Sequence, residues 1–95
     1  MKEFYIKIEG RVQRVGFRRW AKLKALEIGN ISGFVRNEHD GSVEILMRGG
    51  ENEVNLMLQA CYDGPLLARV DKISFLLKTK MSDLPPIIDG SFMVF

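Results

Sequence analysis

The chain has 95 residues, of which 46% are hydrophobic and 27% are charged, and this length and ordinary globular composition predict one domain over residues 1–95. The single cysteine, Cys61, excludes an intrachain disulfide, and the formal net charge of +2 is small for a nucleic-acid-binding protein. No segment approaches the roughly 18 apolar residues of a membrane-spanning helix, and the first residues lack the apolar core of a signal peptide, so we expect a cytoplasmic protein without membrane contact.

The first half of the chain alternates between strand and helix patterns. Apolar residues at every second position over 4–9 predict a half-buried strand. A broad apolar face over 19–28 predicts a helix, and the following Gly29 is a natural helix end. Strands are predicted over 31–37 and 42–48, and the Asp40–Gly41 pair between them indicates a hairpin.

The second half continues with a helix predicted over 51–62, between the glycine pair at 49–50 and the Gly64–Pro65 pair. A fourth strand over 70–77, a loop over 83–86 and a short apolar strand over 91–95 follow. The order strand, helix, strand, strand, helix, strand, with a tail strand, is typical of the α+β ferredoxin-like split βαβ fold. In that fold an antiparallel sheet carries two helices on one face.

The loop between the first strand and the first helix, residues 10–18 (GRVQRVGFR), carries two glycines, three arginines and no acid. A loop at a helix start can point several backbone N–H groups at one place, where the helix dipole adds partial positive charge. Arg18 at its end can add a planar fork of donors with a permanent charge. These are the components of a phosphate-binding site.

Residues 10–18 closely resemble the acylphosphatase signature Gly-x-Val-Gln-Gly-Val-x-Phe-Arg. Residues 33–37 (GFVRN), followed by 41–43 (GSV), are similar to a second signature of that family, Gly-Phe/Tyr-Val-x-Asn and Gly-x-Val. Residues 64–70 contain a third, weaker match. The resemblance implies the ferredoxin-like fold and an enzyme that hydrolyses small acyl phosphates to a carboxylate and inorganic phosphate, with no cofactor and no metal.

The resemblance also implies roles for particular residues. By motif position, Arg18 would bind the phosphate and Asn37 would orient the attacking water. The phosphate oxygens would accept hydrogen bonds from the backbone N–H groups of Gln13, Arg14, Val15, Gly16, Phe17 and Arg18. The first and second strands of a split βαβ unit run parallel, so Arg18 and Asn37 should meet at one sheet edge. Inorganic phosphate and sulfate should compete with the substrate.

Arg14 stands where the family usually has glycine, which suggests a backbone with positive φ or a close approach to a ligand. An arginine in the left-handed region costs roughly 1–2 kcal/mol, and its side chain could crowd the phosphate. Alternatively, the side chain points outward and strengthens anion binding.

Other side chains offer little for a reaction that needs a strong nucleophile or base. His39 is expected to be a solvent-facing turn residue, Cys61 and Trp20 to be core residues, and Arg11 and Arg19 to be solvated charges. Two alternatives to the enzyme remain: an acylphosphatase-like module that binds anions without turnover, and an RNA-binding module. RNA recognition by this fold uses stacked aromatic residues on the sheet, of which the third strand has none. A monomer is expected, although the tail strand could pair across an edge.

Overall fold

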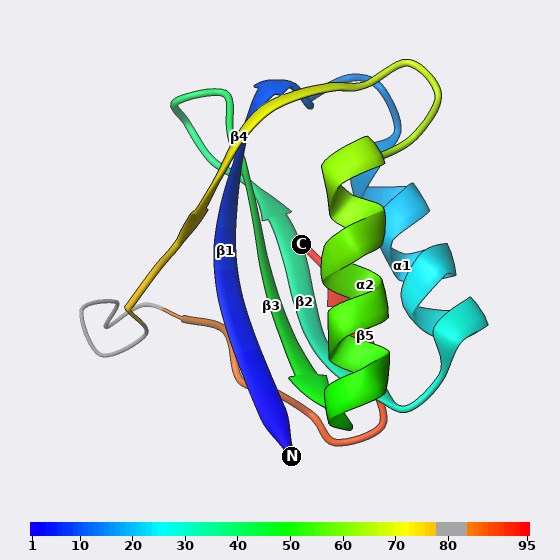
Figure 1. The fold of residues 1–95 in the computed structure, drawn as a ribbon. Coiled ribbons are helices and arrows are strands. Elements are labelled where there is room, and N and C mark those ends of the chain that lie inside the picture. Colours follow the sequence, from blue (N-terminus) through cyan, green and yellow to red (C-terminus); the bar gives the residue numbers. More distant parts are fainter. Residues whose placement is uncertain (78–83) are drawn as a thin grey trace.

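A computed structural model describes residues 1–77 and 84–95, and Figure 1 shows one curved sheet with two helices packed on one face. The elements are β1 (Lys2–Arg11), α1 (Phe17–Ile28), β2 (Ile31–Asn37), β3 (Val43–Gly49), α2 (Glu51–Asp63), β4 (Arg69–Phe75) and β5 (Phe92–Val94). Their order is the predicted one. Residues 84–86 are loop, as predicted, whereas Asp83 lies outside the described residues.

The sheet has the strand order β4-β1-β3-β2-β5. β1 pairs antiparallel with both β3 and β4, and β2 pairs antiparallel with β3. The two parallel strands β1 and β2 therefore flank β3 and end at the same sheet edge, as predicted. The tail strand β5 pairs in parallel with β2, which makes the five-stranded sheet mixed, while the four strands of the split unit are antiparallel.

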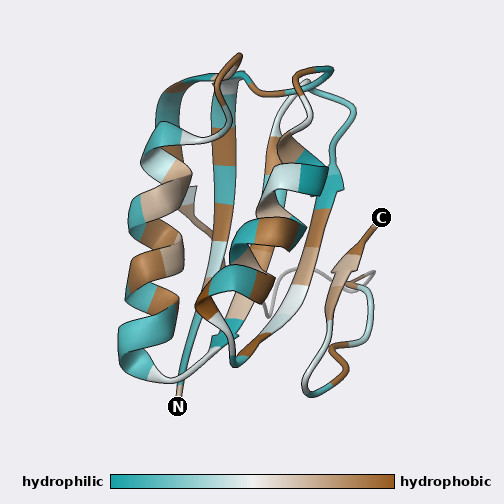
Figure 2. Ribbon diagram, turned by 90° about the vertical axis from the view of Figure 1, so that its right-hand side faces the viewer, coloured by the Kyte–Doolittle hydropathy of each residue, from teal (hydrophilic) through white to brown (hydrophobic). Residues whose placement is uncertain are grey.

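The main core lies between the helices and the sheet. α1 contributes Phe17, Ala21 and Ala25 at a spacing of four residues, which places them on one face of the helix. α2 contributes Cys61, whose burial raises its thiol pKa to about 12. Figure 2 shows hydrophobic and hydrophilic residues alternating along the strands behind the helices, and this alternation gives the sheet one apolar face for the core.

The opposite face of the sheet carries a second, smaller cluster. Tyr5, Phe34 and Leu46 are buried there, packed against partly buried residues of the connection between β4 and β5 and of β5 itself. Tyr5 donates a hydrogen bond to the buried Glu44, and burial, together with this bond, raises the pKa of Tyr5. Because Tyr5 and Phe34 are both covered, neither can stack on a base, which counts against the RNA-binding alternative.

Candidate active site

The loop from Val12 to Gly16 connects β1 to α1 through two residues in the left-handed region, Arg14 (φ 61°) and Gly16 (φ 77°). Gly16 is the N-cap of α1, and its lack of a Cβ makes the positive φ inexpensive. The helix therefore begins at Phe17, two residues before the predicted start. Phe17 and Arg18, which were expected in the loop, lie instead in the first helical turn, so Arg18 projects from a rigid element.

The N-terminus of α1 is open. Over residues 1–77 and 84–95, no side chain caps it by a hydrogen bond, and its first turn contains no acidic residue. The first backbone N–H groups of a helix have no partner within the helix, and Arg18 and Arg19 add positive charge where the helix dipole is already positive. An anion bound at this end would supply the missing acceptors and offset both charges.

A pocket of about 510 Å³ lies at this open helix end. It is lined by Val12, Arg14, Gly16, Phe17, Arg18, Arg19, Lys22, Leu23, Asn37 and Val94. The structure thus brings Arg18 and Asn37 to one pocket, together with Arg14, Gly16 and Phe17 of the predicted loop. Four of the lining residues are cationic and none is acidic, so the pocket suits an anionic ligand.

Five lining residues were not named as site residues from the sequence: Val12, Arg19, Lys22, Leu23 and Val94. Val12 belongs to the same loop, and Arg19, expected to be a solvated charge, directly follows Arg18. Lys22 follows Arg18 by four positions, so the helical repeat would have placed it on the same face, and Leu23 follows Arg19 in the same way. Val94 comes from β5, which is far away in the sequence, and no local signal connects it with this pocket. Gln13 and Val15 belong to the loop but lie outside this lining; Val15 packs against the main core.

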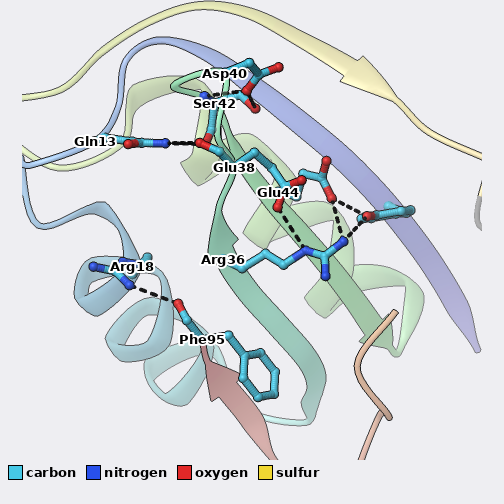
Figure 3. A network of polar contacts seen from close by, with 9 residues as sticks. Gln13, Arg18, Arg36, Glu38, Asp40, Ser42, Glu44 and Phe95 are labelled. Carbon is cyan, nitrogen blue, oxygen red and sulfur yellow. Dashed lines mark hydrogen bonds and ion pairs between the residues drawn. The ribbon is translucent and has the colours of Figure 1, made fainter. Parts of the chain in front are cut away.

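Arg18 contacts the residue that follows β5. Its Nη1 donates a hydrogen bond to the backbone carbonyl oxygen of Phe95 at 2.9 Å, and Figure 3 shows the side chain pointing toward Phe95. The guanidinium has five N–H donors, so this bond leaves donors for a ligand. The contact holds the Arg18 side chain beside β5. Because β5 pairs with β2, and β2 ends at Asn37, this contact brings Arg18 toward the strand that carries Asn37.

Asn37 is the last residue of β2 and lies opposite Val43 in the hairpin. The turn that follows is tightly hydrogen-bonded: Glu38 N donates to Ser42 O at 2.9 Å, and Asp40 Oδ1 accepts from Ser42 N at 3.0 Å. Hydrogen bonds from Lys7 and from Ser42 hold the pKa of Asp40 well below its usual value. These hydrogen bonds fix the backbone conformation of the turn that follows Asn37.

The Gln13 side chain points toward this turn (Figure 3). Its Nε2 donates to the carbonyl oxygens of Glu38, at 2.7 Å, and Ser42, at 2.9 Å. His39 is exposed in the turn, and Trp20 packs partly against the main core, in an edge contact with Phe17. Both placements agree with the expectations from the sequence.

In the described part of the chain, no group of three or more His, Cys, Asp or Glu side chains is arranged to hold a metal ion. No helix among residues 1–77 and 84–95 is long and apolar enough to span a bilayer. The donors gathered at the pocket are thus backbone N–H groups, cationic side chains and one carboxamide, which can bind a phosphoryl group and orient a water molecule.

Comparisons with known proteins agree with this arrangement. The family model described as Acylphosphatase matches residues 4–85. An acylphosphatase of Aliivibrio fischeri is 44% identical over 72 residues, which cover 76% of this chain and 79% of that protein. One of Azorhizobium caulinodans is 40% identical over 86 residues, or 90% and 87% of the two chains. The crystal structure of acylphosphatase from Bacillus subtilis matches with a TM-score of 0.83 at 30% identity, covering 100% of this chain and 99% of that one. With a family model over most of its length and relatives of this similarity, the chain belongs to the acylphosphatase family.

Proposed function

We propose that this chain hydrolyses the carboxyl–phosphate bond of small acyl phosphates, giving a carboxylate and inorganic phosphate, without a metal or organic cofactor. One observation carries the mechanism: Arg18 and Asn37 line the same pocket at the open N-terminus of α1. Membership of the acylphosphatase family supports the reaction itself.

Binding of the phosphoryl group is the first requirement. An acyl phosphate is an activated mixed anhydride, so catalysis needs neutralised charge on the phosphoryl oxygens and an attacking oxygen held in line. We assign charge neutralisation to the guanidinium of Arg18 and to the backbone N–H groups of residues 13–18. Such fixed donors act as a preorganised anion hole, and a planar guanidinium can bind two phosphoryl oxygens at once.

Orientation of the water is the second requirement, and we assign it to Asn37. Its carboxamide oxygen accepts one hydrogen bond from a water molecule and so holds the water opposite the leaving carboxylate. The water oxygen bonds to phosphorus as the bond from phosphorus to the acyl oxygen breaks. The carboxylate leaves with the electron pair, and the protons of the water remain on the phosphate or pass to solvent. Positioning of this kind replaces a general base.

The test is hydrolysis of benzoyl phosphate in the presence of EDTA. We expect turnover by the unmodified chain and a loss of about 10²–10³ in kcat/KM for Arg18→Ala and for Asn37→Ala, because each removes a fixed polar group from the transition state. Matched controls are Arg69→Ala on β4 and Asn55→Ala on α2, neither of which lines the pocket. Circular dichroism checks that each variant is folded.

Loss of activity on chelation would contradict the metal-free mechanism, and full activity in either pocket variant would remove that residue's role. Inorganic phosphate and sulfate should inhibit competitively, and less strongly in Arg18→Ala.

We also propose a cytoplasmic monomer folded as one domain over residues 1–95, without nucleic acid as a partner. Size-exclusion chromatography tests the monomer.

An acylphosphatase-like module that binds anions without turnover is the second candidate. It is favoured by Arg14, which occupies the position of a family glycine and lines the pocket. If the unmodified chain binds phosphate without hydrolysing benzoyl phosphate, and Arg14→Gly restores turnover, this second candidate replaces the first.

A further inference from the structure

Gln13 is the second residue of the loop before α1. The nitrogen of its carboxamide donates hydrogen bonds to two backbone carbonyls of the β2–β3 turn. The acceptors are Glu38 O at 2.7 Å and Ser42 O at 2.9 Å. A primary amide nitrogen carries two N–H donors, and both are used here. The side chain is partly buried, so these hydrogen bonds are sheltered from water.

The two carbonyls lie next to the cross-strand pair of Asn37 and Val43, one on each arm of the hairpin. Glu38 directly follows Asn37, and Ser42 directly precedes Val43, the cross-strand partner of Asn37. Within the turn, Ser42 O already accepts the N–H of Glu38, and Glu38 O accepts the N–H of Gly41 at 3.2 Å. Gln13 adds one further hydrogen bond to each carbonyl from outside the hairpin, and so connects the loop to the backbone beside Asn37.

The turn itself is anchored from other directions. Arg36 forms an ion pair with Glu38 at 3.2 Å and another with the buried Glu44 at 3.3 Å, as Figure 3 shows. Asp40 accepts hydrogen bonds from Ser42 and pairs with Lys7 of β1. Because these contacts fix the turn, the carboxamide of Gln13 sets the position of the loop relative to the turn.

This connection matters because β1 and β2 do not pair with each other. β3 lies between them, which separates the strands by about 10 Å. The loop after β1 carries the N–H groups proposed to bind the phosphate, whereas the end of β2 carries the residue proposed to hold the water. In-line attack requires a defined distance between these two groups, and a displacement of 1 Å can lower a rate by about 100-fold.

We propose that Gln13 is a positioning residue for the hydrolysis: its side chain holds the phosphate-binding loop at the distance from Asn37 that the phosphoryl group and the water require. The inference rests on the proposed function. It gives Gln13 a role through its side chain, in addition to the backbone N–H predicted from the sequence.

The experiment compares the unmodified chain with Gln13→Met and Gln13→Glu, using benzoyl phosphate with EDTA. Methionine keeps the unbranched shape and length but has no N–H donor, and glutamate replaces the donor by an oxygen that repels both carbonyls. Gln59→Ala, an exposed glutamine on α2, is the matched control. We expect kcat to fall about 10- to 100-fold in both Gln13 variants, with a smaller change in KM, and no change in Gln59→Ala.

A double-mutant cycle separates positioning from a general structural role. If Gln13 acts through Asn37, Gln13→Met should reduce kcat much less in the Asn37→Ala background than in the unmodified chain. Equal reductions in both backgrounds, or a kcat of Gln13→Met within twofold of the unmodified value, would overturn the positioning role while leaving the proposed function intact. If Gln13→Met does not fold, the same comparison is made with Gln13→Glu. An unmodified chain without turnover would overturn both proposals.

Discussion

Arg14 is the residue at which the loop over residues 10–18 departs from the acylphosphatase signature, and its backbone adopts the conformation that a glycine would favour. Its φ of 61° lies in the left-handed region, which residues other than glycine, asparagine and aspartate seldom adopt. Its side chain is exposed and lines the pocket. The positive φ suggested by the family glycine is therefore present, whereas the two alternatives for the side chain, crowding the phosphate or strengthening anion binding, stay predictions.

Replacing Arg14 by glycine should stabilise the protein. Glycine removes about 1–2 kcal/mol of strain from the left-handed conformation. It also makes the unfolded chain more flexible, which lowers the free energy of unfolding by roughly 0.5–1 kcal/mol, so the relief of strain is the larger effect. A net gain of about 1 kcal/mol corresponds to a rise in Tm of about 4–8 °C for a domain of this size. Chemical and thermal denaturation measure both quantities.

Arg14→Ala is the control for this prediction, because alanine removes the charge but keeps a Cβ at the same φ. It should gain less stability than glycine. An equal gain in both variants would mean that repulsion from the neighbouring cations, and not the backbone, destabilises this position.

At the scale of elements, the start of α1 and the end of β2 carry the two proposed catalytic residues, and the β2–β3 turn follows directly after Asn37. Apolar periodicity predicted the helix from residue 19, because Gly16 gives no polar capping signal and the first turn is rich in arginine. The hairpin was predicted from Asp40 and Gly41. Gly33, which weakened the prediction of β2, is required there: a Cβ would lie 1.8 Å from the Leu46 carbonyl oxygen.

The turn should contribute stability that depends on pH. Because hydrogen bonds from Lys7 and Ser42 lower the pKa of Asp40 in the folded state, the unfolded chain binds more protons in the acid range. This contribution is fully present above the unfolded pKa of about 4 and is lost as the pH falls toward the folded pKa. Asp40→Asn should therefore be less stable than the unmodified chain at pH 6, and the difference should shrink below about pH 4.

Urea denaturation between about pH 2.5 and pH 6 measures this effect. Asp63→Asn at the end of α2 is the control, since Asp63 forms no ion pair within the described ranges. A difference between Asp40→Asn and the unmodified chain that stays constant over this range would contradict the prediction.

At the scale of the whole molecule, the formal charge is only +2, yet positive charge gathers at the pocket. Arg14, Arg19 and Lys22 line it and form no ion pair within residues 1–77 and 84–95. An uneven charge distribution of this kind raises the local concentration of anions, and salt screens the effect. Substrate capture should therefore depend on ionic strength far more than the net charge suggests.

We expect kcat/KM for benzoyl phosphate to fall roughly 10-fold between about 10 mM and 500 mM sodium chloride, mainly through KM. The combined variant Arg19→Ala/Lys22→Ala should show a weaker dependence. Steady-state kinetics over a salt series measures this, and a KM that does not change with salt in the unmodified chain would rule out electrostatic capture.

Local patterns in the sequence determined the element order, the hairpin at Asp40 and the motifs that contain Arg18 and Asn37. The parallel direction of β1 and β2 in a split βαβ unit then placed both motifs at one sheet edge. Only the tertiary structure decided that Gln13 holds Glu38, 25 residues away, that Arg18 contacts Phe95, 77 residues away, and that Val94 lines the pocket. Periodicity and turn chemistry report on residues a few positions apart, whereas these contacts depend on how distant segments pack around one sheet.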